Sequence, residues 1–143
     1  MIGRMGSVSS AGYSATPLAQ KLGIKAGSRV FVANAPRGYL QLLEPLPPGV
    51  VFAKRVSSAI TVAHVFTADR QELMRHLDSL RGLLNPEAMI WVSWPKKASK
   101  VLTDVTEETI RQIAFPLGLV DVKVCAVTEV WSGLKLVVRK ELR

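Results

Sequence analysis

The sequence MIWVSWPKKASK, at residues 89–100, joins an apolar strand to a basic loop. Its first six residues are apolar except for one serine, and they are rich in residue types that favour strands. One proline and three lysines lie among the next six residues. A short and almost wholly apolar strand is typical of a parallel sheet buried on both faces. Because ligands in such sheets bind beyond the carboxyl ends of the strands, the lysines lie where a ligand site is expected.

Similar apolar segments occur earlier in the chain, and segments with helical patterns separate them. The best-defined helix covers residues 69–84, where leucines recur at helical spacing and Asp69 with Glu72 forms a capping-box pattern. Thr16 is expected to cap a first short helix, which Gly23 ends. Strands are predicted over residues 29–34, 50–55 and 60–66, and one or two helical turns over residues 39–44.

The end of the chain follows a different pattern. Thr106 is expected to cap a helix over residues 107–116, and strands over 120–129 and 134–141 then follow in direct succession. Residues 131–133, Trp-Ser-Gly, are interpreted as the hairpin turn between them. The sequence therefore predicts a three-layer Rossmann-like α/β fold, with a mostly parallel sheet and a C-terminal antiparallel hairpin. This arrangement is similar to a shortened class I methyltransferase fold.

Composition limits the class of protein. A chain of 143 residues, 48% of them hydrophobic, is expected to form a single folded domain, over residues 11–143, after a flexible segment at 1–10. No apolar run approaches the roughly 20 residues that span a bilayer, and no export sequence is recognised, so a cytoplasmic protein without membrane contact is expected. The two histidines and one cysteine are far apart and form no metal-ligand pattern.

The charge of the chain is strongly basic and unevenly distributed. The formal net charge is +8, and the first 60 residues hold seven basic residues against a single acid, Glu44. This balance favours an acidic partner, such as a phosphorylated small molecule, a nucleic acid or an anionic surface. Ordinary solubilising charge is the alternative explanation.

Two positions bear on cofactor binding. Methyltransferases and dinucleotide-binding proteins of this fold need a glycine-rich turn after the first strand and an acid near the end of the second. Here the turn at residues 34–38 is NAPRG, with one glycine, and Lys54-Arg55 stand where the acid is expected. Both departures argue against S-adenosylmethionine or NAD, and the cofactor is left unknown. A divergent or degenerate methyltransferase stays an alternative.

The main hypothesis is a small anionic ligand at the carboxyl edge of the sheet. Cationic, hydrogen-bonding and aromatic side chains are expected to converge there. Solvated loop ends are the simpler alternative. No catalytic motif is present, so catalysis is left open, and a basic nucleic-acid-associated protein is ranked last. The candidate binding residues are Arg37, Lys54, Arg55, Lys96, Lys97 and Lys100 for charge, Asn34, Ser93 and Ser99 for hydrogen bonds, and Trp94 as an apolar wall.

His64 lies inside the predicted strand at residues 60–66. It could act as a general base near the strand end, but a histidine among apolar residues is more often a hydrogen-bonded core residue, and that is the expectation here.

Several motifs resemble a family of small bacterial proteins known only as a domain of unknown function. They include AGYS at residues 11–14, NAP at 34–36, WVSWPKK at 91–97 and WSGLK at 131–135. The resemblance extends over nearly the whole chain after Ser10. It implies a bacterial cytoplasmic protein, and it carries no known activity.

Overall fold

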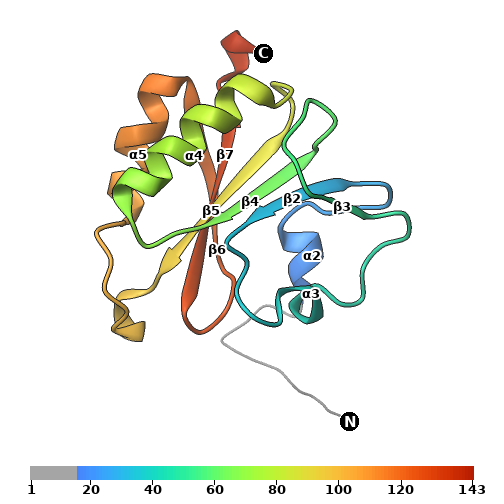
Figure 1. Cartoon of the computed structure of the whole chain (residues 1–143), viewed down its shortest axis with the longest axis horizontal. Helices are drawn as coiled ribbons and strands as arrows, with labels where there is room; N and C mark the ends of the chain where they lie inside the picture. The colour runs from blue at the N-terminus through green and yellow to red at the C-terminus, as the bar shows by residue number, and fades with distance from the viewer. Residues whose placement is uncertain (1–15) are drawn as a thin grey trace.

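A six-stranded sheet forms the centre of the molecule (Figure 1). The computed structural model describes residues 16–143, so the predicted flexible segment at 1–10 and the AGYS motif lie outside the described residues. The strand order is β3-β2-β4-β5-β7-β6. The strands are β2 (Arg29–Ala33), β3 (Val51–Ala53), β4 (Val62–Phe66), β5 (Met89–Pro95), β6 (Leu119–Ala126) and β7 (Trp131–Val138).

The sheet is parallel except at one strand. Strands β3, β2, β4 and β5 are parallel neighbours, and β7 is antiparallel to both β5 and β6. The predicted sheet, mostly parallel and with an antiparallel pair at its C-terminal end, is confirmed.

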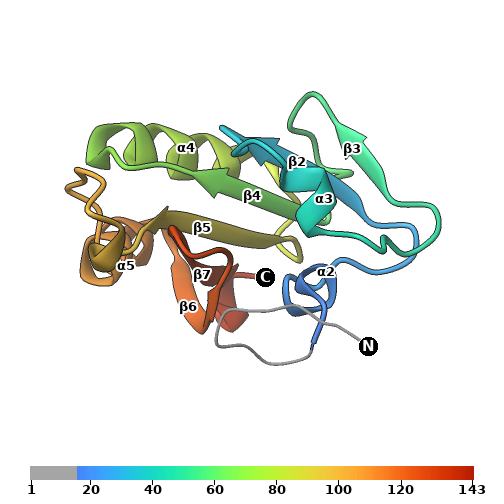
Figure 2. The same cartoon turned by 90° about the horizontal axis from the view of Figure 1, so that it is seen from below.

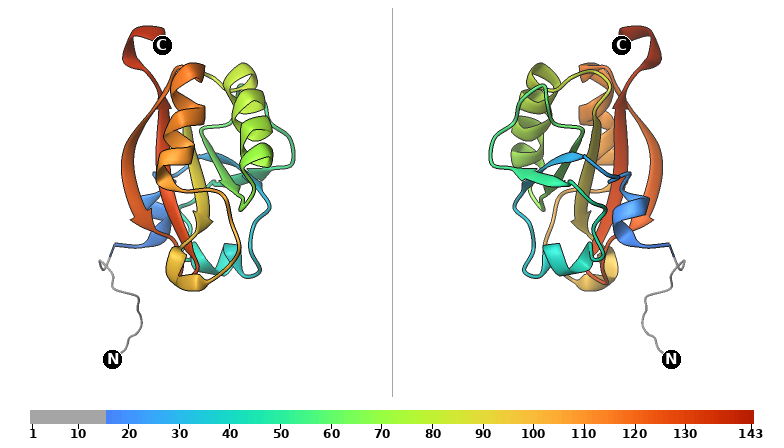
Figure 3. Two further views of the ribbon diagram at one scale, coloured as in Figure 1. Left: turned by 90° about the vertical axis from the view of Figure 1, so that its left-hand side faces the viewer. Right: turned by 90° about the vertical axis from the view of Figure 1, so that its right-hand side faces the viewer.

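Helices cover both faces of this sheet (Figures 2 and 3). Helices α4 (Arg70–Leu83) and α5 (Glu107–Ala114) pack on one face, and the single-turn helices α2 (Leu18–Lys21) and α3 (Tyr39–Leu42) pack on the other. Short 3-10 turns follow at Lys97–Ser99 (η1), Phe115–Leu117 (η2) and Lys140–Leu142 (η3). None of the helices within residues 16–143 is long and apolar enough to cross a bilayer.

Strand β4 explains why the central strands are almost wholly apolar in sequence. All five of its residues are buried. Ala63 and Val65 join the core beneath α4 and α5, whereas Val62 and Phe66 join the core beneath α2 and α3. A strand covered on both faces alternates between two apolar cores, so it shows no polar alternation.

The predicted helix caps are confirmed at two helices. The Asp69 carboxylate accepts the backbone N–H of Glu72 at 2.9 Å, and the Thr106 hydroxyl accepts that of Thr109 at 3.1 Å. At α2 the prediction is wrong, because the residue before the helix is Pro17 and no side chain caps it.

The predicted turn at residues 131–133 is also wrong, because these residues begin strand β7. The turn lies between Ala126 and Trp131, where the Thr128 hydroxyl accepts the backbone N–H groups of Val130 and Trp131. Gly133 is a packing glycine. A Cβ atom there would lie 3.0 Å from Val127 and 3.3 Å from the Trp91 ring, so close approach inside the sheet explains this residue.

Candidate functional site

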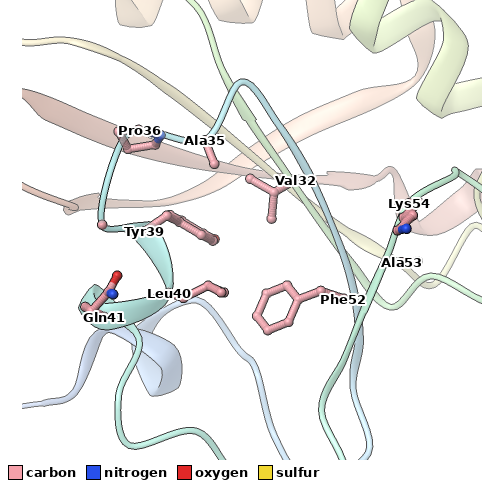
Figure 4. Close-up of a pocket in the computed structure, with 10 residues that line it drawn as sticks. Val32, Ala35, Pro36, Tyr39, Leu40, Gln41, Phe52, Ala53 and Lys54 are labelled. Atoms are coloured by element: carbon pink, nitrogen blue, oxygen red, sulfur yellow. The ribbon is translucent and has the colours of Figure 1, made fainter.

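An open hollow of about 650 Å³ lies between α3 and two neighbouring strands, β2 and the edge strand β3 (Figure 4). Its walls are mainly apolar, with a lysine at the end of β3 and a glutamine on α3 as the longest polar groups. The lining residues are Val32, Ala35, Pro36, Gly38, Tyr39, Leu40, Gln41, Phe52, Ala53 and Lys54.

The hollow exists because α3 is very short. The chain leaves β2 through Asn34, with φ of 59°, and enters α3 at Gly38, with φ of 79°. The helix begins at Tyr39, and Pro45 disfavours helical backbone at the residue before it, so only one turn forms. One turn cannot cover both β2 and β3. Apolar side chains therefore stay open to solvent, and Leu40 is 53% exposed.

Among the described residues that line the hollow, Lys54 is the only one with a charged side chain. Phe52, Val32 and Leu40 face the same space, and no carboxylate is among the lining residues. A mostly apolar concave surface with one cation at its rim suits a ligand with an apolar body and an anionic group.

A buried hydrogen-bonded chain lies behind the hollow. The hydroxyl of Tyr39 lies 2.8 Å from His64 Nδ1, and the Ser93 hydroxyl lies 2.8 Å from His64 Nε2. All three residues are buried, and the imidazole stacks on Phe66. Burial lowers the pKa of His64 to about 3 and raises the pKa of Tyr39. His64 is therefore a neutral, hydrogen-bonded core residue, as expected from the sequence, and it has no access to solvent.

A second polar network bridges the carboxyl ends of β2 and β4. Asn34 donates its amide to the Phe66 carbonyl at 3.1 Å and to the Glu72 carboxylate at 3.2 Å. Thr67 donates to the same carboxylate at 2.6 Å. The order of connection reverses between these two strands, because β3 lies on one side of β2 and β4 on the other. This reversal is where open α/β sheets hold their ligands, and here side chains bond to one another across it.

Two predicted site residues lie elsewhere than the sequence suggested. Ser93 is fully buried and bound to His64, and Trp94 is 9% exposed within the core beneath α4 and α5. The prediction ended the strand at Trp94 and placed that side chain in the loop. In fact β5 continues to Pro95, which pairs with Trp131 of β7. Trp94 therefore occupies a ladder position opposite Ser132 rather than a place in a polar loop.

The remaining predicted residues do not form one cluster. Lys54 is the one predicted cation that lines the hollow. Arg37 and Arg55 are exposed, and each is adjacent in sequence to a lining residue. Around η1, Ser99 donates its hydroxyl to the Lys96 carbonyl at 2.6 Å, and Lys97 and Lys100 are exposed. Anion binding by these η1 residues stays a prediction.

Sequence reasoning missed the apolar part of the hollow. Tyr39, Leu40 and Phe52 were assigned to predicted elements and not to a site. The feature that could have found them is the spacing between Gly38 and Pro45, which leaves room for little more than one helical turn.

Comparison with known proteins identifies the fold. No family model matches the chain, and no curated protein matches it. Solved structures of methyltransferases do match. A methyltransferase dependent on S-adenosylmethionine from Aquifex aeolicus matches 85% of this chain and 87% of its own, with a TM-score of 0.57 and 12% identity. A type 11 methyltransferase, so described provisionally, from Sulfolobus solfataricus matches 86% of this chain and 90% of its own, with a TM-score of 0.58 and 12% identity.

The mitomycin 7-O-methyltransferase MmcR has a TM-score of 0.59 at 10% identity over 78% of this chain, which spans 49% of the length of MmcR. The fold is a shortened form of the Rossmann-like fold of class I methyltransferases. At these identities the likeness concerns the fold alone.

The residues at the site do not fit S-adenosylmethionine. A dinucleotide or adenosyl group needs glycines so that it can approach the backbone of the first turn, and here Pro36 stands in that turn. The ribose hydroxyls need an acceptor at the end of the next strand, and Lys54 offers only donors. The cofactor is also a cation at its sulfonium, and no carboxylate lines the hollow to balance it.

Proposed function

We propose that this chain is a degenerate methyltransferase-fold protein that binds a small amphipathic anion in the hollow beside α3. The observation that carries the proposal is the lining, whose described residues carry one charge, that of Lys54, beside a wall of Val32, Leu40 and Phe52. The anionic group of the ligand, a carboxylate or a phosphate, pairs with the Lys54 ammonium. Its apolar part covers the surface that the short α3 leaves open.

We propose binding rather than catalysis at this place. Tyr39 is the lining residue with an ionisable hydroxyl, and its oxygen is already bound to the buried His64. The described lining offers no nucleophile next to a solvent-accessible base, which is the arrangement that covalent chemistry requires.

Matched pairs of ligands test the proposal. Octanoate and phenyl phosphate carry the anion, and octanol and phenol lack it. Wild type is expected to gain melting temperature with the two anions and much less with the two alcohols, because a ligand of the folded state raises its stability. Lys54→Gln is expected to weaken binding of the anions by roughly tenfold or more, since a charge-assisted hydrogen bond is lost. Lys140→Gln, which neutralises an exposed lysine of η3 outside the lining, is the control. Equal responses to anion and alcohol would overturn the role of Lys54.

A divergent methyltransferase that uses S-adenosylmethionine is the second candidate. The solved structures of this fold favour it, and they include a fibrillarin from Aeropyrum pernix with natively bound S-adenosyl-L-methionine. Saturable binding of the cofactor in a calorimetric titration would favour this candidate over the first. The resemblance to the bacterial family of unknown function stays a prediction and adds no activity to either.

A further inference from the structure

Three lysines from three elements lie on the α2 side of the β6–β7 hairpin. Lys123 of β6 is directly opposite Lys135 of β7. Two positions along, the pair Cys125 and Gly133 lies on the same face of the hairpin, because side chains alternate along a strand. Cys125 packs into the core formed with α2, so both lysines point to the α2 side.

Helix α2 brings the third lysine to this surface. The helix packs on the face of the sheet that Cys125 and Trp91 share, and the Trp91 indole fixes it by donating to the Leu22 carbonyl at 2.9 Å. Lys21 is the last residue of α2. Burial raises the pKa of the Cys125 thiol, and the charges of Lys21 and Lys123 oppose that rise. Trp91 is also paired with Lys135 in the sheet, so the end of α2 that its indole holds lies on the same face as Lys135.

The arrangement is unfavourable without an anion. Side chains directly opposite in an antiparallel pair have Cβ atoms about 4.5–5.5 Å apart, and like charges there are destabilising. Within residues 16–143, ion pairs involve only Arg111 and Arg139 among the basic residues. Asp121, the acid within β6, bonds to Arg111 of α5. The first fifteen residues contain no acid.

We propose that Lys21, Lys123 and Lys135 form an anion-binding site for a phosphate group. Three ammonium groups suit an anion with more than one negative charge and several acceptor oxygens, which favours phosphate over a single carboxylate. A bound phosphate removes the repulsion between Lys123 and Lys135. The site is independent of the proposed hollow, because β3 and β6 form opposite edges of the sheet.

Two probes distinguish the sources of the phosphate group: pyrophosphate for a small phosphorylated molecule and a 20-nucleotide single-stranded RNA for a nucleic acid. The variants are Lys123→Thr and Lys135→Thr, with Lys140→Thr as the control at an exposed lysine of η3. In phosphate-free buffer at low salt, both hairpin variants are expected to melt at a higher temperature than wild type, because the repulsion is gone. The control is expected to melt with wild type.

Added anion is expected to raise the melting temperature of wild type more than that of the hairpin variants. Pyrophosphate or RNA is expected to raise the melting temperature of wild type and of the control, and to raise that of the hairpin variants by less than half as much. If the source is RNA, its affinity falls with salt, and each hairpin variant lowers the salt slope by about one. Stabilisation by pyrophosphate alone assigns the site to a small ligand. No shift of wild type with either probe, or an equal loss in the control, would overturn the proposal. Because Lys123 is exposed, Lys123→Thr is expected to fold, and it provides the test if Lys135→Thr does not fold.

Discussion

The hydroxyl of Tyr39 lies 2.8 Å from Nδ1 of His64, and this contact fixes α3 against the middle of the sheet. A helix of four residues is not stable by itself. Its position depends on tertiary contacts, and the Tyr39 hydroxyl and the buried Leu43 provide them. Because α3 forms one wall of the hollow, the buried imidazole determines the shape of a site that it does not line.

His64→Leu is expected to destabilise the protein, because it leaves the buried hydroxyls of Tyr39 and Ser93 without their partner. Each stranded hydroxyl costs about 1–3 kcal/mol. Urea unfolding followed by circular dichroism measures the change. The triple variant Tyr39→Phe, His64→Leu and Ser93→Ala removes all the polar groups together and is expected to be more stable than His64→Leu. A triple variant that is less stable than the single one would contradict this account.

Acid is expected to destabilise the protein through His64. The pKa of His64 is about 3 in the folded state, below the ordinary value of 6.5, so folding favours the neutral ring. Above the ordinary pKa both states are neutral and the contribution of His64 is fully present. As the pH falls below about 6.5, the unfolded chain gains a proton that the folded one does not, and stability falls by up to about 1.4 kcal/mol per pH unit. Unfolding free energies of wild type and His64→Gln, measured over this range, should fall with different slopes, the shallower slope being that of the variant. Parallel slopes would show that His64 is not the group responsible.

Trp94→Ala tests the placement of this residue in the core. Because Trp94 is 9% exposed beneath α4 and α5, truncation is expected to cost about 3–5 kcal/mol. Leu102→Ala is the control, since Leu102 is 94% exposed and its truncation is expected to change stability by less than about 0.5 kcal/mol. Chemical denaturation of both variants measures these changes in the free energy of unfolding. A loop position for Trp94 would instead give two similar, small effects.

Two glycine-to-alanine substitutions should have opposite signs. Gly133→Ala places a methyl group 3.0 Å from Val127 and 3.3 Å from the Trp91 ring, and is expected to cost about 1–3 kcal/mol through overpacking. Gly82 lies within α4 with no atom within 4 Å of an added Cβ. Gly82→Ala is expected to gain about 0.5–1 kcal/mol from helix propensity. Melting temperatures that move in the same direction would contradict the packing role of Gly133.

The sequence predicted the elements better than it predicted their ends. Asp69 and Thr106 identified their helices because a capping side chain acts locally. The end of β5 depends on pairing with β7, 36 residues further along at Trp131, so the sequence of the strand itself did not place Trp94 in the sheet. Gly133 was misassigned for the same reason, since its function is contact with distant side chains. Lys54, which lines the hollow, was among the predicted residues because charge at a strand end is visible in sequence. The apolar wall beside it was not, because it arises from what the short α3 leaves uncovered.

The most direct test of the central claim is a calorimetric titration of the wild-type protein with S-adenosylmethionine and, separately, with phenyl phosphate, repeated on Lys54→Gln. The proposed use of the hollow predicts no saturable heat with S-adenosylmethionine at millimolar concentration, and saturable binding of phenyl phosphate that Lys54→Gln weakens. Saturable binding of S-adenosylmethionine to the wild type, with no binding of phenyl phosphate, would contradict the claim and identify a methyltransferase with an unusual cofactor site.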